Sequence, residues 1–402
     1  MTLNIDVLVV DDSQLMQRII TTLLESDPAI RVVGTAADGY QAIEQVRVLS
    51  PGVVLMDVQM PRLDGLAALQ QIMQQKPTPV VVLSGINQAS AAIRALELGA
   101  VEFVAKPSGP ISIDLYKVRD ELIEKVKLAR LANLKRPAAQ AKRPPLPLAA
   151  PRPALQRKYM VAIASSAGGP QTLDKLFRQL PAELPACVLV AQHMPAGFTA
   201  SFARRLDQHS PLRVVEARDG QSARPGVAYI APGGVHMAVA EEKGQVVIRL
   251  LDTPTVNAVR PSADVLMTSV AQIAGACSVG VVLTGMGKDG SAGLGQIKRA
   301  GGITLAQDQE SSIIFGMPKA AIGQGVVDQV LPLANMAAGI VEAIQHLIGW
   351  EKSHRQQGRK WLPPPAGLRP SPRVQGESRT CSPRAATRQG GTKGGLVSGQ
   401  ES

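Results

Sequence analysis

The stretch IDVLVVDDSQLMQRIITTLLE, residues 5–25, decides the fold of the first part of the chain. Its largely apolar start (5–10) predicts a buried strand, and the apolar residues of 14–25 recur at helical spacing. Asp11 and Asp12 lie between the strand and the helix. In α/β proteins built from such βα units, functional groups gather at the carboxyl ends of the strands.

The same alternation continues as far as residue 126. Four more strands are predicted, at residues 31–37, 53–57, 79–84 and 101–106. Helical patterns lie between and after them. Five consecutive βα units predict a doubly wound, flavodoxin-like parallel sheet over residues 1–126.

A second α/β domain is expected after a linker. Residues 127–157 are rich in Pro, Ala and Arg, a composition that favours extended segments. Alternating strand and helix patterns return over 158–349, which predicts a second doubly wound, Rossmann-like parallel sheet. It has an antiparallel β-hairpin excursion near 226–251. The tail, 350–402, is rich in Pro, Gly, Ser and Arg and is expected to be disordered.

The net charge of +11 comes from the linker and the tail. Residues 127–158 hold nine Lys or Arg and no acid, and residues 351–402 hold ten Lys or Arg against three acids. The basic surplus therefore predicts solvated connecting segments, and we expect no nucleic-acid partner.

Cysteine usage and hydropathy indicate the compartment. The three cysteines show no CxxC spacing, which fits a reducing environment without a disulfide framework or zinc site. No apolar run approaches about 18 residues, and the N-terminus lacks the features of a signal peptide. We expect a cytoplasmic protein without membrane insertion.

Three carboxylates are predicted to meet at one edge of the first sheet. Asp11 and Asp12 follow the first strand, and Asp57 ends the third. Like charges at this separation need a cation, and carboxylate oxygens suit Mg²⁺. Asp57 could then attack phosphorus, while Lys106 and Ser84, at the ends of two further strands, bind the transferred group. Acidic residues after strands are often only helix caps. Polar groups at the ends of four different strands are much less often accidental, and they favour a phosphoryl site.

These residues resemble a response-regulator receiver domain across 1–126. The resemblance rests on VLVVDDS (7–13), VVLMDVQMPRLDG (53–65), VVVLSG (80–85) and GAVEFVAKP (99–107). It implies that Asp57 is the phospho-acceptor and that Asp11 and Asp12 help it to hold Mg²⁺. It implies that Ser84 and Lys106 sense the phosphoryl group.

A second set of polar residues follows strands of the second domain. Ser166 ends the predicted strand 158–165 and precedes Gly168, Gly169 and Pro170, which suit a tight turn into a helix. A serine there places its hydroxyl near helix N–H groups, where an oxyanion is stabilised. Glycine-rich turns of this kind also bind phosphates or nothing, so the turn alone does not decide its function.

His193 ends the strand 188–193, and Asp289 follows the strand 278–285. A lone histidine is usually structural and a Gly-flanked acid is usually turn chemistry, but all three groups at strand ends predict a Ser-His-Asp hydrolase. The expected oxyanion donors are the backbone N–H groups of Ala167 and Met286. The chain order differs from that of α/β-hydrolases.

Residues 158–349 resemble the catalytic domain of the chemotaxis receptor methylesterase family, CheB. The motifs are AIASSAGGP (162–170), AQHMPAGFTASFARRL (191–206), AYIAPGGVHM (228–237), NAVRPSADVL (257–266), VVLTGMGKDGSAG (281–293) and IFGMPKAAI (314–322). The resemblance implies hydrolysis of glutamate γ-methyl esters on chemoreceptors and deamidation of receptor glutamines. It implies chemoreceptors as substrates, a chemotaxis histidine kinase as phosphodonor, peripheral association with receptor arrays and no cofactor in the esterase domain.

Two positions depart from the family pattern: Ala164 stands where Gly is usual, and Lys288 where Asn is usual. Ser165 adds a second serine beside Ser166, but neighbouring strand side chains face opposite ways, so only one can meet His193.

The order of receiver and hydrolase predicts regulation. We expect the unphosphorylated receiver to cover the cleft of the hydrolase, and phosphorylation of Asp57 to favour an open arrangement. Phe103 occupies the aromatic switch position of receivers, although it could equally be an ordinary core aromatic. Two other readings are a DNA-binding response regulator, disfavoured because no helix-turn-helix pattern is present, and a non-catalytic α/β binding module.

Overall fold

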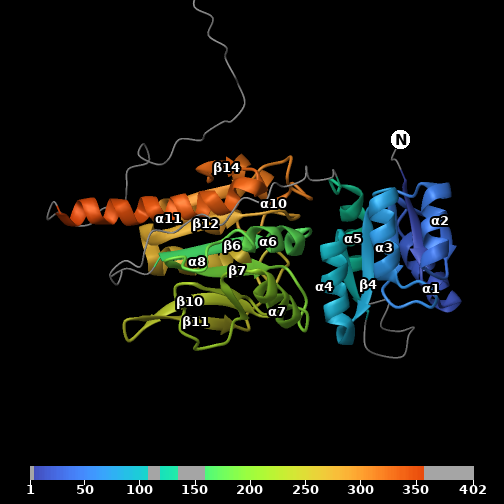
Figure 1. Cartoon of the computed structure of the whole chain (residues 1–402), viewed down its shortest axis with the longest axis horizontal. Coiled ribbons are helices and arrows are strands. Elements are labelled where there is room, and N and C mark those ends of the chain that lie inside the picture. The colour runs from blue at the N-terminus through green and yellow to red at the C-terminus, as the bar shows by residue number, and fades with distance from the viewer. Residues whose placement is uncertain (1–3, 107–117, 135–158, 357–402) are drawn as a thin grey trace, which may run out of the picture. The chain divides into compact units, whose positions relative to one another are not determined.

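The computed structural model describes residues 4–106, 118–134 and 159–356 (Figure 1). The first of its sheets has five parallel strands in the order β2-β1-β3-β4-β5. The strands are β1 (Ile5–Val10), β2 (Ile30–Ala36), β3 (Val53–Asp57), β4 (Val80–Gly85) and β5 (Glu102–Lys106). The helices are α1 (Gln14–Glu25), α2 (Gly39–Leu49), α3 (Gly65–Gln75), η1 (Ile86–Gln88), α4 (Ala89–Leu98) and α5 (Arg119–Arg130).

The central strands of this sheet are apolar because helices cover both of their faces. Alternate residues of β1 enter different cores: Leu8 and Val10 lie in one hydrophobic cluster, and Val7 and Val9 lie in another. All four side chains are fully buried. A strand buried on both faces reads as a continuous apolar run, which is typical of parallel sheets.

The second sheet has seven strands in the order β14-β13-β12-β6-β7-β9-β8, with every recorded pairing parallel. These strands are β6 (Tyr159–Ser165), β7 (Ala186–Gln192), β8 (Arg213–Glu216), β9 (Val227–Ile230), β12 (Ser278–Val282), β13 (Ile303–Gln307) and β14 (Gln329–Leu331). The helices are α6 (Gly169–Phe177), α7 (Thr199–His209), α8 (Ala263–Ala274), η3 (Gly275–Cys277), α9 (Ser291–Arg299), α10 (Met317–Gly323) and α11 (Leu333–Gln356).

The two predicted parallel α/β sheets are confirmed, and the hairpin excursion is shorter than expected. Strands β10 (His236–Glu242) and β11 (Gln245–Leu251) form an antiparallel pair. The first part of the expected excursion, however, contains β9, which pairs in parallel with β7 and β8. Residues 226–235 therefore lead through the main sheet before the hairpin begins.

Helices extend past two of the expected domain limits. Helix α5 continues to Arg130, because Leu128 and Ala129 are buried and prolong its apolar face. Helix α11 continues to Gln356. Residues 127–130 of the expected linker and 350–356 of the expected tail are therefore helical. The remaining linker from 135 to 157 and the tail from 357 lie outside the described residues.

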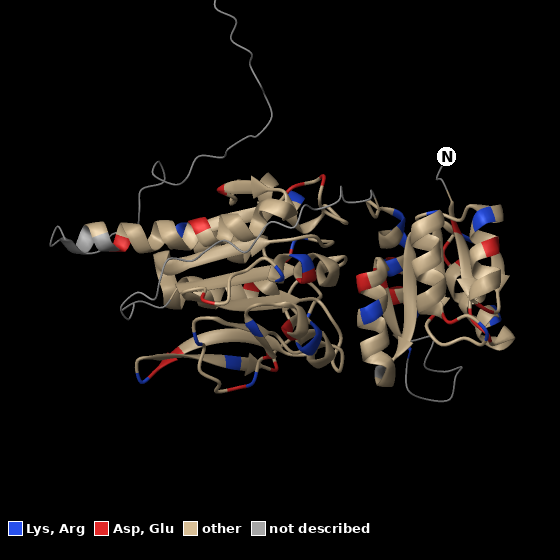
Figure 2. Ribbon diagram, viewed as in Figure 1, with Lys and Arg blue, Asp and Glu red and all other residues tan. Residues whose placement is uncertain are grey.

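Charged side chains are absent from the inner strands β6, β7, β12 and β13 and occur mainly on helices and loops (Figure 2). Among the described residues, none of the helices combines the length and the hydropathy needed to cross a membrane.

Helices α8 and α9 approach so closely that they require a glycine. A Cβ added to Gly293 would lie 2.6 Å from the Met267 Cβ and 3.0 Å from the Asp264 Cα. We expect Gly293→Ala to lower the free energy of unfolding by about 1–3 kcal/mol, because the added methyl group must push the helices apart. Urea unfolding measures the loss. Gly323→Ala in α10 is the control, since nothing lies within 4 Å of its added Cβ. Equal stability of the two variants would contradict this account of the packing.

Candidate functional sites

The three acidic residues of the first sheet lie together, as the sequence predicts. One carboxylate oxygen from each of Asp11, Asp12 and Asp57 lies within 4.8 Å of the others. Asp11 and Asp57 are buried, whereas Asp12 is exposed. A set of hard oxygen donors that is open on one side suits Mg²⁺, which keeps several of its own water ligands.

Lys106 holds this cluster together electrostatically. Its Nζ lies 3.2 Å from Asp11 Oδ2 and 2.9 Å from Asp57 Oδ2. Burial by itself would lower the pKa of Lys106, but the charges of Asp57 and Asp11 outweigh burial and raise it. Burial also raises the pKa of Asp57, and Lys106 opposes that rise.

Ser84 and Phe103 lie in neighbouring strands but have different surroundings. Ser84 is fully buried and follows Leu83, the residue that pairs with Asp57. Its hydroxyl is 3.3 Å from the backbone oxygens of Gly85 and Gln88. The Phe103 ring is buried in the core, 4.5 Å from the ring of Phe198 between centroids.

The second site is built where three strands of the seven-stranded sheet end. In the β6–β7 pairing Ser165 lies opposite Gln192, so Ser166 and His193 each follow directly on a paired residue. The His193 N–H donates to Ser165 O at 3.0 Å, and the Ser166 N–H donates to Thr284 O at 3.0 Å. Residue 284 follows β12, so all three strand ends converge on the serine.

The turn after Ser166 leaves no room for larger residues. Gly168 has φ of 71°, a conformation that glycine adopts readily. A Cβ on Gly169 would lie 2.0 Å from Gln192 Oε1. The same Gln192 amide donates to Ser166 O at 2.9 Å and to His193 O at 3.0 Å. The turn is therefore tied to the end of the neighbouring strand.

The two adjacent serines have separate environments. The Ser165 hydroxyl is fully buried and donates to Gln192 Oε1 at 2.7 Å. The Ser166 side chain is only partly buried and, within the described residues, its hydroxyl makes no hydrogen bond, to His193 included. The hydrogen bond between a nucleophile and its base is often long without substrate. The relevant observation is that the backbones of 166 and 193 directly follow paired residues of β6 and β7.

His193 is joined to Asp289 through its Nε2, which lies 2.8 Å from Asp289 Oδ2. This leaves Nδ1 as the nitrogen available to the serine. Burial by itself would raise the pKa of Asp289, which is only 2% exposed. The hydrogen bond and charge of His193, with hydrogen bonds from Ser262 and Ala263, outweigh burial and lower that pKa from 3.8 to about 2.

Asp289 also caps helix α8. Its carboxylate accepts hydrogen bonds from the backbone N–H of Ala263 at 2.6 Å and of Asp264 at 3.3 Å. Ser262 is the N-cap residue, but it makes no side-chain cap bond, because its hydroxyl donates to Asp289 Oδ1 at 2.6 Å. The positive end of the helix therefore stabilises the ionised carboxylate.

The capping is reciprocal between two helices. Asp264, in the first turn of α8, accepts from the N–H of Gly293 in α9 at 2.7 Å. Asn257 Nδ2 bridges the two acids, at 2.8 Å from Asp264 Oδ2 and 2.8 Å from Asp289 Oδ1. Gln192, Asn257, Ser262 and Asp264 lie within the motifs 191–206 and 257–266, but no local pattern in the sequence marks them as partners of the site.

The backbone N–H groups expected to bind the oxyanion belong to Ala167 and Met286. Within the described residues, the N–H groups of Ala167 and Met286 have no hydrogen-bond acceptor. Ala167 is 1% exposed, whereas Met286 is 44% exposed. Gly285 lies against the serine, since a Cβ added to it would be 2.7 Å from the Ser166 Cβ. The Met286 turn is therefore close to the nucleophile candidate.

Residues of the first domain contact the turn that carries Ser166. Leu128 of α5 packs in one cluster with Ala167 and Ile314. The Gly168 N–H donates to Val101 O at 3.3 Å. Farther from the turn, Arg205 Nε lies 2.5 Å from Glu97 Oε1, which joins α7 to α4.

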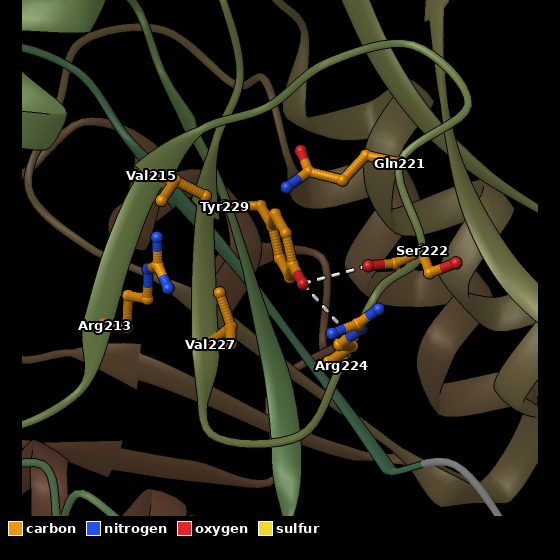
Figure 3. Close-up of a pocket in the computed structure, with 7 residues that line it drawn as sticks. All are labelled: Arg213, Val215, Gln221, Ser222, Arg224, Val227 and Tyr229. Carbon is orange, nitrogen blue, oxygen red and sulfur yellow. Dashed lines mark hydrogen bonds between the residues drawn. The ribbon is translucent and has the colours of Figure 1, made fainter.

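A hollow of about 310 Å³ lies away from these groups, between β8, β9 and the segment 221–224. Figure 3 shows the Tyr229 ring in this hollow, with Arg213 and Arg224 beside it. The Tyr229 hydroxyl donates to Ser222 O and accepts from the Arg224 N–H, both at 3.0 Å. None of the predicted site residues lines it, so it is not part of the candidate active site.

Comparison with known domain families gives two matches. A response regulator receiver domain matches residues 7–115, and a CheB methylesterase domain matches residues 161–340. A protein-glutamate methylesterase/protein-glutamine glutaminase of Pyrococcus horikoshii is 46% identical over 357 residues, covering 86% of this chain and 95% of that protein. The chain belongs to the CheB methylesterase family.

Other CheB proteins show the same likeness. A Pseudomonas aeruginosa protein-glutamate methylesterase/protein-glutamine glutaminase 2 is 42% identical, covering 84% of this chain and 96% of that protein. The solved Thermotoga maritima CheB methylesterase catalytic domain is 43% identical, with a TM-score of 0.45, and covers 46% of this chain and 98% of that one. The T. maritima CheB response regulator domain is 42% identical, with a TM-score of 0.31, and covers 32% and 98%.

We expect Asp289→Asn to destabilise the second domain, because an amide cannot replace the anion at the N-terminus of α8. The pKa of 3.8 lowered to about 2 corresponds to about 2 kcal/mol of stability. Since the folded pKa is depressed, this stability is present above about pH 4 and is lost as the pH falls towards 2.

Urea unfolding of wild type and Asp289→Asn at pH 6 and pH 3 measures this dependence. The difference between the two proteins is expected to shrink at the lower pH. A difference that stayed constant would mean that ionisation of Asp289 contributes nothing to the stability of this domain.

Proposed function

We propose that this protein is a phosphorylation-activated methylesterase that removes methyl groups from glutamate γ-methyl esters of chemoreceptors. The observation that carries the proposal is that Ser166 and His193 directly follow the paired strands β6 and β7, and that Asp289, in the connection from β12 to α9, is bonded to His193. The names of the CheB relatives supply the substrate class. The role of such an enzyme is adaptation in chemotaxis.

The geometry supports a double-displacement hydrolysis. His193 Nδ1 takes the proton of the Ser166 hydroxyl as its oxygen attacks the ester carbonyl. The N–H groups of Ala167 and Met286 bind the oxyanion of the tetrahedral intermediate, and each such donor is worth about 3 kcal/mol. Asp289 holds the imidazole and stabilises its cationic form. The imidazolium then protonates the departing methoxide, which leaves as methanol.

The second half of the reaction uses the same groups. His193 removes a proton from water, which attacks the acyl-enzyme and restores the Ser166 hydroxyl, leaving a glutamate carboxylate. A glutamine side chain offers an equivalent carbonyl, with ammonia as the leaving group. We therefore propose the glutaminase activity of the relatives for this chain also. No step requires a metal ion or other cofactor in this domain.

In the receiver domain, Asp57 is the proposed phospho-acceptor. Asp11, Asp12 and Asp57 would hold Mg²⁺, which neutralises the carboxylates and the incoming phosphoryl oxygens. Lys106 is placed to pair with a phosphoryl group on Asp57, since it already lies 2.9 Å from that carboxylate. We propose that the Ser84 hydroxyl, which now contacts the backbone oxygens of Gly85 and Gln88, donates to the phosphoryl group.

Control of the esterase by the receiver is supported by contacts at the serine turn. Leu128 packs on Ala167, whose N–H is a proposed oxyanion donor, and Val101 O accepts from Gly168. Phe103 packs on Phe198, so movement of the switch aromatic would disturb this contact. We propose that the unphosphorylated receiver restricts access to Ser166 and that phosphorylation loosens these contacts.

The proposed partners are methyl-accepting chemoreceptors and a chemotaxis histidine kinase, with the protein acting in the cytoplasm in peripheral association with receptor arrays. We propose no nucleic-acid partner, because the basic surplus lies in the linker and the tail. A non-catalytic binding module is disfavoured, because the described residues retain the complete His–Asp pair beside the serine.

We expect Ser166→Ala to abolish methanol release from methylated receptor membranes, with kcat falling at least about 1,000-fold, because no nucleophile remains. Ser165→Ala is the matched variant and is expected to keep activity within about tenfold, because the Ser165 hydroxyl faces Gln192. The reverse pattern, or methanol release by Ser166→Ala at the wild-type rate, would exclude this nucleophile.

We expect a small phosphodonor with Mg²⁺ to raise the methanol-release rate of the wild type. Asp57→Asn should not respond, because its side chain cannot form the acyl phosphate, and EDTA should remove the response of the wild type. Asp64→Asn, on an exposed helix cap in the same domain, is the control that should still respond. Activation of Asp57→Asn by the phosphodonor would contradict the assignment.

A further inference from the structure

The carboxylate of Asp289 receives more hydrogen bonds than a His–Asp pair requires. Oδ2 accepts from His193 Nε2 and from the Ala263 N–H. The other oxygen, Oδ1, faces away from His193 and accepts from Ser262 Oγ at 2.6 Å and Asn257 Nδ2 at 2.8 Å. These two side-chain donors come from the segment that leads into α8.

This segment is anchored at both ends by a buried histidine. The fully buried His236 accepts the Ser262 N–H at its Nδ1, at 3.0 Å. Its Nε2 therefore carries the proton and donates to Pro254 O, also at 3.0 Å. The His236 ring thus joins residues 254 and 262, the two ends of the segment. Ser262 and Asn257, at the end and within this segment, both donate to Asp289.

The Ser262 hydroxyl bonds a side chain instead of the backbone of its own helix. An N-cap serine normally uses its hydroxyl to cap the following helix. Here the hydroxyl is given to Asp289, and the Asp289 carboxylate caps α8 in its place. The arrangement fixes both oxygens of Asp289, so the carboxylate cannot rotate away from the imidazole.

We propose that Ser262 and Asn257 are positioning residues of the catalytic site, which hold Asp289 in line with His193 and share its negative charge. Both residues would act through Asp289, to whose Oδ1 they donate. The inference rests on the proposed Ser-His-Asp hydrolysis, but the placement of the carboxylate can be tested without substrate.

Loss of either donor should change the chemistry in a defined direction. With fewer hydrogen-bond donors, the Asp289 carboxylate stabilises the protonated imidazole of His193 more strongly. A higher pH is therefore needed to remove that proton and obtain the neutral base. The acidic limb of the pH profile of kcat/KM is therefore expected to move to higher pH. Looser alignment should lower kcat by roughly tenfold to a hundredfold, with little change in KM. Asp264 and His236, the other ionisable groups of the network, remain unchanged in both variants.

Two variants of the full-length protein test the proposal. Ser262→Ala removes the hydroxyl. Asn257→Gly removes the amide from an exposed position where φ is 54°, so glycine adds no backbone strain. Ser269→Ala is the control, because this buried hydroxyl on the same helix accepts from the Val239 N–H, donates to Leu266 O and does not touch Asp289. Circular dichroism and urea unfolding confirm that each variant is folded.

The first measurement is the pH profile of methanol release. The two test variants should show the lower kcat and the shifted limb, and Ser269→Ala should match the wild type. A second measurement needs no substrate: the low-field proton resonance of the His193 Nε2–H shared with Asp289. It should move in Ser262→Ala and Asn257→Gly and stay in place in Ser269→Ala.

The outcomes separate the two claims. If the wild type releases no methanol, the proposed esterase function fails, and the proton resonance alone still tests the positioning role. If both test variants keep the wild-type resonance, and any activity they have keeps the wild-type pH limb, the positioning proposal is overturned. A loss of kcat without either shift would show a general structural defect and would likewise overturn it.

Discussion

The second domain depends on the ionised carboxylate of Asp289 at the start of helix α8. This one group ends the His193 relay, caps α8 and receives Ser262 and Asn257. A buried charge is costly unless it is paired and fully hydrogen-bonded. Because five donors surround this carboxylate, burial does not neutralise it, and its pKa stays near 2. The same hydrogen bonds that stabilise the start of α8 therefore keep this carboxylate ionised beside His193.

The parallel sheet explains why distant residues can meet at this carboxylate. Parallel strands all present their carboxyl ends at one edge, so the ends of β6, β7 and β12 are neighbours although the chain between them is long. The reciprocal caps then join the helices that follow: Asp289 to α8 and Asp264 to α9. The site residues themselves lie in the connections between these strands and helices, and hydrogen bonds to the neighbouring elements hold them in place.

The receiver uses the same architecture for a different chemistry. Its carboxylates meet at the strand ends, with Lys106 as the internal cation. Leu128 of α5 and Val101, the residue before β5, contact the turn that carries Ser166. Phe103 and Glu97 add an aromatic contact with Phe198 and an ion pair with Arg205.

The sequence alone determined the two α/β sheets and the positions of Asp57, Ser166 and His193 at strand ends. These follow from periodicity, from glycine turns and from the alternation of side chains along a strand, which are local properties. Only the tertiary structure decided that β9 belongs to the parallel sheet, that Asp289 caps α8, and that Ser262 and Asn257 bind it. Such hydrogen bonds join residues some thirty positions apart, and no local pattern specifies which donor meets which oxygen.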